Sequence, residues 1–157
     1  NAKKHPGMQL VDEKNESFDD ANKTFEKAKE ILRKHPDIRG FQGSAGNDVI
    51  GIGRAVEAAG LQDKVCVVGT GLPNATAQYL ESGAVKAIGY WDPKDAGMAM
   101  NAIAKLLVQK KPLTDGMNLG VKGYEHVTIR KGPGEGVLVL GDAMVIDDKS
   151  TYKEHLF

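Results

Sequence analysis

The sequence has few of the features that mark disulfide-linked, nucleic-acid-binding or membrane proteins. It holds a single cysteine, Cys66, in 157 residues, so no internal disulfide can form. Basic and acidic residues number 21 each, and the resulting net charge of zero gives no electrostatic basis for binding nucleic acid or a membrane surface. No stretch approaches the roughly 18 consecutive apolar residues of a membrane span.

Catalytic and metal-binding motifs are also missing from the sequence. None of the histidines has metal-ligand spacing or stands beside a nucleophile: His5, His35, His126 and His155. The Gly-x-Gly pairs at residues 51–53 and 69–71 do not complete a dinucleotide-binding motif, because Val56 and Asn74 stand where a third glycine would. We therefore expect a binding protein rather than an enzyme, with no cofactor and no metal.

The composition itself is that of an ordinary globular protein, with 41% hydrophobic and 27% charged residues. A chain of 157 residues is long enough for one domain or for one large lobe of a bigger protein. It begins at Asn1 without a methionine or a signal peptide, and its first residues are typical of a helix end that leads into a strand. We expect it to be part of a longer protein.

Residues 64–91 contain the clearest pattern in the chain. Their first apolar run, at residues 65–68, is typical of a strand buried on both faces of a parallel sheet, which would bury Cys66. It is followed by a break rich in glycine, an amphipathic helix and a second apolar run, at residues 69–74, 75–81 and 84–91. Open α/β sheets bind ligands at the carboxyl ends of their strands, so we expect a ligand at the break.

Strands and helices alternate along most of the chain. The remaining expected elements are strands at residues 8–11, 38–41, 137–140 and 144–146, helices at residues 17–34, 49–59 and 93–109, and a final helical turn from residue 147. Ser17 is the expected N-cap of the first helix, and Phe18 begins its apolar stripe. The alternation predicts βαβ units and a three-layer α/β/α lobe with a mostly parallel sheet.

Three loops at expected strand ends, at residues 42–48, 70–74 and 91–95, combine small residues with polar side chains. The candidate ligand-binding residues in them are Asn47, Asp48, Pro73, Asn74, Trp91 and Asp92. Asparagine amides donate and accept hydrogen bonds, carboxylates accept them, and a tryptophan offers a flat apolar face to a sugar ring. The pattern predicts a small polyol that is bound without the breaking of any bond.

Each candidate also has a purely structural interpretation. Asn47, Asp48 and Asp92 precede helices and are ordinary N-cap residues. Pro73 and Asn74 are typical of turns, and Trp91 fits core or hinge packing equally well. The sequence leaves these alternatives open, and the prediction of a site depends on the three loops meeting at one edge of the sheet.

Segments at residues 42–48, 67–74 and 83–93 resemble, in this order, the second half of a type I periplasmic sugar-binding protein. The chain is most similar to the rhamnose and autoinducer-2 binding subgroup of ABC importers, in residues 35–37, in Trp91-Asp92 and in its last six residues. The resemblance covers almost the whole chain. It implies a periplasmic binding protein-like fold and a fragment of a two-lobed protein that closes over a sugar-like ligand.

The resemblance implies a role for each part of the chain. Residues 1–91 would form the C-terminal sugar-binding lobe, residues 92–136 a hinge crossing and a helix of the other lobe, and residues 137–157 a tail that returns to the first lobe. Asn47 matches a ligand-binding asparagine of ribose-type relatives. Ser44 and Gly46 match loop contacts of the autoinducer-2 branch.

Two positions depart from the ribose-type pattern. Trp91 stands where ribose-type relatives place a ligand-contacting glutamine. Those relatives also have an aspartate in the loop that corresponds to residues 69–73, which this sequence lacks. A ribose-like specificity is therefore not expected.

The implied function is that of the solute-binding component of an ABC sugar importer. It would bind a neutral sugar or an autoinducer-2-like polyol, meet the ABC permease, and lie in the periplasm or be lipid-anchored outside the cytoplasm. The alternatives are the effector domain of a sugar-responsive repressor, which the neutral charge does not support, and a flavodoxin-like enzyme, which lacks its phosphate-binding loop. The broad Ala/Met-rich face of residues 93–109 also predicts that the fragment forms a homodimer.

Overall fold

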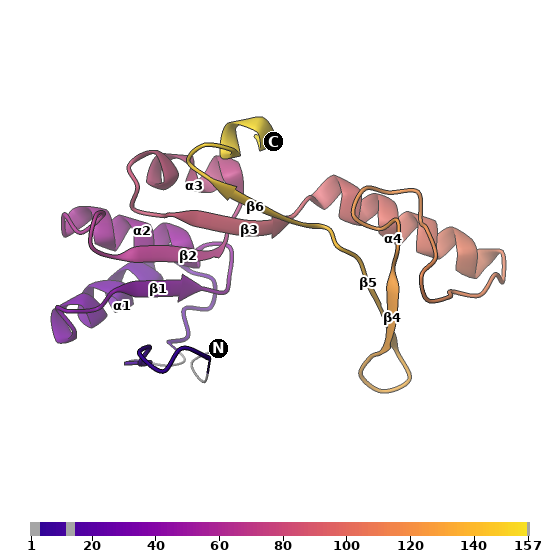
Figure 1. The fold of residues 1–157 in the computed structure, drawn as a ribbon, viewed down its shortest axis with the longest axis horizontal. Helices are drawn as coiled ribbons and strands as arrows, with labels where there is room; N and C mark the ends of the chain where they lie inside the picture. The colour runs from indigo at the N-terminus through magenta and orange to yellow at the C-terminus, as the bar shows by residue number, and fades with distance from the viewer. Residues whose placement is uncertain (1–3, 12–14, 157) are drawn as a thin grey trace. The chain divides into compact units, whose positions relative to one another are not determined.

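The computed structural model describes residues 4–11 and 15–156, which pack as two units (Figure 1). The first unit comprises Asn1–Gly89 together with Ile146–Phe157, and the second comprises Tyr90–Val145. The helices are α1 (Ala21–Lys34), α2 (Asp48–Ala58), α3 (Pro73–Glu81) and α4 (Pro93–Val108). The strands are β1 (Gly40–Gly43), β2 (Cys66–Thr70), β3 (Ala87–Trp91), β4 (Thr128–Lys131), β5 (Val137–Leu140) and β6 (Met144–Asp148), and a short 3-10 helix spans Tyr152–His155.

A four-stranded sheet with the order β1-β2-β3-β6 forms the centre of the first unit (Figure 1). Strands β1 and β2 are parallel, with Gly40 opposite Cys66, and β2 and β3 are parallel, with Val68 opposite Ala87. Helices α2 and α3 connect these strands, as the alternation of elements predicts. The predicted α/β class with a mostly parallel sheet is therefore confirmed.

Helix α1 begins later than the sequence predicts. Its N-cap is Asp20, not Ser17, because the Asp20 carboxylate accepts hydrogen bonds from two backbone N–H groups of the first turn at 2.8 and 3.0 Å. Phe18 was expected in the apolar stripe of this helix, but it lies on the preceding turn and is 77% exposed. Ala28 and Ile31 are buried, as their spacing predicts.

Strand β2 is buried on one face only, which corrects the prediction made from its apolar run. Val67 is fully buried, whereas Cys66 is exposed and Val68 is 37% exposed. Helix α2 packs against β1 and β2 on the face of Val67 and not on that of Cys66. A short apolar run does not distinguish a strand covered on both faces from one whose outward residues are also apolar.

Residues 8–11 do not form the expected strand. Met8, Leu10 and Val11 are all exposed, and among the described residues this segment has no strand pairing. A strand requires a neighbouring sheet edge as well as an apolar sequence, because its backbone groups bond between strands. The local pattern alone was insufficient here.

The second unit contains α4 and an antiparallel pair of strands, β4 and β5. Asp92 is the N-cap of α4 and Pro93 its first residue, as predicted. Within α4, all of which is described, Ala99 alone is buried, and Met100 and Val108 are exposed. Strand β4 was not predicted, because the segment that contains it has few apolar residues.

Helices α1 and α2 pack closely at Gly51. A Cβ atom at this position would lie 2.5 Å from the Ala21 carbonyl oxygen and 2.6 Å from the Thr24 Cβ. The backbones of the two helices therefore approach at a distance that only glycine allows. This contact sets the position of α1, and of the turn before it, against α2.

We predict that Gly51→Ala lowers the free energy of unfolding by about 1–3 kcal/mol, because the added methyl group overpacks the contact between α1 and α2. Urea titration followed by far-UV circular dichroism measures this change. Gly97→Ala in α4 is the control: no atom lies within 4 Å of its Cβ position, so the helix should be unchanged or stabilised by up to ~1 kcal/mol. Equal effects of the two substitutions would contradict the close contact.

Candidate functional site

The candidate residues fall in both units. Two loops of the first unit, between β1 and α2 and between β2 and α3, follow the carboxyl ends of adjacent parallel strands. These loops and the first turns of the helices that follow them contain Ser44, Gly46, Asn47, Asp48, Pro73 and Asn74. Trp91 and Asp92 belong to the second unit. The structure therefore brings the first two predicted loops to one edge of the sheet.

Glycines allow these two loops to pack together. Gly43 lies opposite Gly69 in the parallel pair of β1 and β2. A Cβ atom on Gly69 would clash with the Gly43 carbonyl oxygen, and one on Gly71 would lie 2.9 Å from Val49 Cγ2 of α2. The glycine pair at residues 69 and 71 thus serves to place the first turn of α2 against the strand ends.

Asp48 fixes the loop between β1 and α2. Its carboxylate accepts hydrogen bonds from Ser17 Oγ at 2.6 Å, from Thr24 Oγ1 at 3.3 Å, and from the backbone N–H groups of Ser44 and Ala45 at 3.0 and 2.9 Å. Burial acts to raise the pKa of Asp48, but these hydrogen bonds outweigh burial and leave the pKa below its usual value. The carboxylate is thus bonded within the protein and holds the loop in place.

Asn47 connects the same loop to the turn before α1. Its backbone N–H donates to Asp19 Oδ1 at 2.8 Å, and its side-chain Nδ2 donates to the Asp19 carbonyl oxygen at 2.9 Å. Asn47 occupies the N-cap position of α2, but its side chain makes no capping bond to that fully described helix. The amide is therefore held in one orientation at the surface by the neighbouring turn.

The turn bonded to Asn47 contains Phe18, which becomes a further candidate site residue because its ring is exposed. Phe18 and Asp19 have left-handed backbone angles, φ 55° and 57°, which are costly for residues other than glycine. The Phe18 ring is exposed, with the Lys23 ammonium 5.3 Å from its centroid. Residues with strained backbone angles occur often at ligand sites. The sequence could have indicated this through Asp20, because an N-cap at Asp20 leaves Phe18 outside the helix.

The other residues of the two loops differ in accessibility. Pro73, the first residue of α3, is fully buried. Ser44 and Asn74 are exposed, and no atom lies within 4 Å of a Cβ position on Gly46. The exposed polar groups of the two loops are therefore a hydroxyl and two amides, which suit a neutral, hydroxyl-rich ligand.

Trp91 is the last residue of β3 and Asp92 is the N-cap of α4, and both belong to the second unit. Trp91 is 52% exposed, so it is not packed in a core, and the alternative of hinge packing stays a prediction. Asp92 caps α4, since its Oδ1 accepts hydrogen bonds from the backbone N–H groups of Lys94 and Asp95 at 2.8 and 3.4 Å. Its structural interpretation is therefore correct.

The described part of the chain was also searched for metal-ligand groups and for membrane-spanning helices. Within residues 4–11 and 15–156, no three histidine, cysteine, aspartate or glutamate side chains are grouped as ligands for a metal ion. The helices described there are all too short or too polar to span a bilayer.

Comparison with known proteins gave one family model and several solved structures of similar fold. Residues 1–112 match a family model described as periplasmic binding protein domain. LsrB from Clostridium saccharobutylicum, solved in complex with AI-2, is 21% identical with a TM-score of 0.81, and the match covers 99% of this chain and 52% of LsrB.

Two further solved structures are similar to the chain. A solute-binding protein from Agrobacterium vitis bound with α-D-tagatopyranose is 18% identical with a TM-score of 0.73, covering 99% of this chain and 46% of that protein. One from Clostridium phytofermentas with bound L-rhamnose is 18% identical with a TM-score of 0.70, covering 87% of this chain and 46% of that protein. The chain thus spans about half the length of the structures that it matches, and these likenesses show the fold.

We predict that Asp48→Ala lowers the free energy of unfolding at neutral pH by about 2 kcal/mol, because it leaves several buried or half-buried donors without their acceptor. Urea titration measures the change. Asp37→Ala is the control: Asp37 is exposed, and its carboxylate has no bond to any described residue, so the change should stay within about 0.5 kcal/mol.

The effect of Asp48→Ala should also depend on pH. The pKa of Asp48 is lower in the folded protein than its ordinary value, so its stabilising contribution is complete above the unfolded pKa of about 3.9 and is lost as the pH falls through the folded pKa. The difference in unfolding free energy between wild type and variant should therefore shrink in acid. A difference that stays constant down to about pH 2 would contradict the bonded carboxylate.

Proposed function

The chain belongs to the family of periplasmic binding protein domains, and we propose on this basis that it is the sugar-binding part of a solute-binding protein of an ABC importer. The observation that supports the ligand class is the exposed Phe18 ring, on a strained turn whose Asp19 is hydrogen-bonded to Asn47. Similar folds are solved with AI-2, L-rhamnose and α-D-tagatopyranose, all of them small hydroxyl-rich molecules.

In this proposal the ligand is held by stacking and hydrogen bonds alone. The Phe18 ring contacts the C–H face of the sugar, and the amides of Asn47 and Asn74 and the Ser44 hydroxyl bond its hydroxyl groups. Gly46 leaves room for the ligand to approach the loop. Asp48 and Pro73 act by supporting these groups, and the ligand-binding roles of Trp91 and Asp92 stay predictions.

The whole protein would have two lobes, since its solved relatives are about twice as long as this chain. Residues 1–91 would supply most of one lobe, residues 92–136 would include a hinge crossing and a helix of the other, and residues 137–157 would return to the first. Ligand-dependent closure would present the protein to an ABC permease. Its location would then be periplasmic or otherwise outside the cytoplasm.

We predict that L-rhamnose, D-tagatose or AI-2 binds the chain, with Phe18→Ala weakening the binding by about tenfold because the stacking surface is lost. Titration followed by NMR chemical shifts detects weak binding and gives the dissociation constant. Leu156→Ala is the control, because Leu156 is also an exposed apolar residue of the first unit but lies near the C-terminus. Unchanged affinity in Phe18→Ala would remove the ring from the site, and no binding of any of the three ligands would overturn the proposed ligand class.

The exposed face of α4 leads to a second expectation, that the chain forms homodimers. Met100 and Val108 are exposed on this helix, and apolar side chains grouped on one helix promote association. Sedimentation velocity should show a dimer that grows with concentration and that Met100→Ser/Val108→Ser shifts toward monomer. A monomer at every concentration would contradict this.

A further inference from the structure

The carboxyl end of α3 is satisfied locally except at its last residue, Glu81. The Gln78, Tyr79 and Leu80 carbonyl oxygens accept hydrogen bonds from the backbone N–H groups of Ser82, Val85 and Gly83, and Gly83 has the left-handed φ of 76° that is common after a helix end. No lysine, arginine or histidine occurs in the last turn, and the negative end of the helix dipole disfavours the Glu81 carboxylate. The partners of the Glu81 carbonyl oxygen and carboxylate come from another part of the chain.

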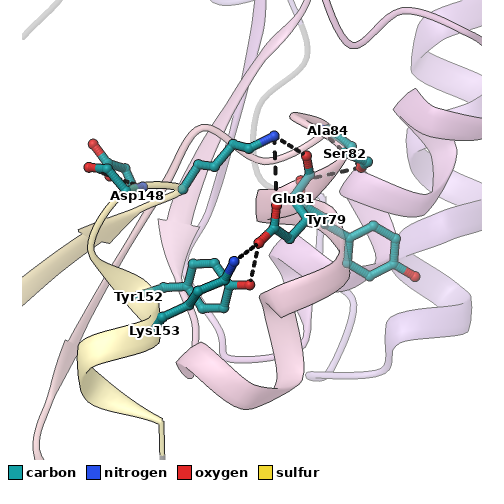
Figure 2. A network of polar contacts seen from close by, with 9 residues as sticks. Tyr79, Glu81, Ser82, Ala84, Asp148, Tyr152 and Lys153 are labelled. Atoms are coloured by element: carbon teal, nitrogen blue, oxygen red, sulfur yellow. Dashed lines mark hydrogen bonds and ion pairs between the residues drawn. The ribbon is translucent and has the colours of Figure 1, made fainter.

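The C-terminal tail supplies this compensation, as Figure 2 shows. Lys149 Nζ donates to the Glu81 carbonyl oxygen at 2.7 Å and lies 3.7 Å from Glu81 Oε2. Lys153 Nζ and the Tyr152 hydroxyl both reach Glu81 Oε1, at 2.6 and 2.7 Å. One carbonyl and one carboxylate of α3 thus receive two ammonium groups and a hydroxyl from residues about seventy positions later in the sequence.

The charge state of Glu81 agrees with this arrangement. The hydrogen bond from Lys153, followed by that from Tyr152, lowers the pKa of Glu81 to about 2. The same contacts raise the pKa of Lys153 and of Tyr152. The carboxylate and the ammonium are therefore both charged over the whole physiological range of pH, and added salt will weaken their attraction.

The tail is itself ordered by local bonds. His155 Nδ1 lies 2.9 and 3.1 Å from the two carboxylate oxygens of Asp147, which is fully buried. Asp148 Oδ1 accepts hydrogen bonds from the Ser150 backbone N–H and hydroxyl at 2.7 and 2.6 Å. Tyr152 is buried although its hydroxyl meets Glu81. The tail therefore docks on α3 as a formed structure.

Helix α3 is a rigid connection between the tail and the candidate site. Pro73 at its first position and Leu80 near its end are both fully buried. At its amino end the Thr76 hydroxyl and backbone N–H both donate to the Leu72 carbonyl oxygen, at 2.7 and 3.1 Å. Asn74 lies on this first turn. A displacement at Glu81 therefore reaches Asn74 through one helix of nine residues.

We propose that residues 147–155 complete the carboxyl-terminal cap of α3 at Glu81, and that Glu81 is a positioning residue for Asn74 at the other end of the helix. The cap follows from the contacts at Glu81, whereas the effect on a ligand depends on the proposed function. Loss of the cap loosens the whole of α3, including its first turn, and so lowers ligand affinity without removing a ligand contact.

The test compares Lys149→Met/Lys153→Met with Lys64→Met. Lys64 is exposed in the same unit, and its side chain has no ion pair or hydrogen bond with any described residue, so its substitution removes one surface charge without breaking a contact. We expect amide hydrogen exchange at Thr76 and Ala77 to become about threefold to tenfold faster in the double variant only. The affinity for L-rhamnose should fall by a similar factor, and wild type in about 1 M NaCl should shift in the same direction.

A double-mutant cycle isolates the contact at Glu81. Glu81→Gln should reproduce the fast exchange at Thr76 by removing the carboxylate that both lysines contact, and adding Lys149→Met/Lys153→Met to it should cause little further change. Faster exchange confined to residues 147–155, or raised equally in β1 and β2, would overturn the proposal, since the first indicates local fraying and the second general destabilisation. Faster exchange in α3 without L-rhamnose binding in wild type would support the cap while counting against that sugar as the ligand.

Discussion

The accessible site depends on one interaction, the acceptance of several hydrogen bonds by the Asp48 carboxylate. Its partners come from the turn before α1, from α1 itself and from the loop after β1. The next residue back, Asn47, is held by Asp19, which lies in the turn between Ser17 and α1, so both residues tie the loop after β1 to that turn. The hydrogen bonds that hold the loop are the same ones that lower the pKa of Asp48, so the geometry of the loop and the charge of the carboxylate have one origin.

Local sequence signals predicted the parts of the fold that depend on local chemistry. The alternation of apolar runs and helices gave the parallel sheet, and the Asp92-Pro93 pair gave the start of α4. The start of α1 could not be predicted in this way, because Ser17 and Asp20 are both good N-caps. Ser17 bonds Asp48, 31 residues later, and this tertiary contact leaves Asp20 to cap the helix.

The same distinction applies to the candidate site. The positions of the two loops followed from strand order and are confirmed, since parallel strands end at one edge. The local sequence did not predict which of these side chains are accessible. The Asp48 carboxylate is bonded by Ser17, 31 residues earlier, and Pro73 is fully buried in the folded chain. Phe18 was missed for a related reason: an apolar residue near a helix start fits the core pattern until the turn that exposes it is known.

The two ends of α3 are held by parts of the chain that lie at very different distances in sequence. Its amino end lies in the loop of the candidate site, while its carboxyl end is bonded by a tail that follows the second unit in the chain. The first unit therefore contains two segments of the chain that are separated by residues 90–145. The contacts between the tail and Glu81 span about seventy residues. Such contacts cost loop entropy and form late in folding. A charged cap suits this position, because ammonium groups on long side chains reach an exposed helix end without the repacking that a buried contact would require.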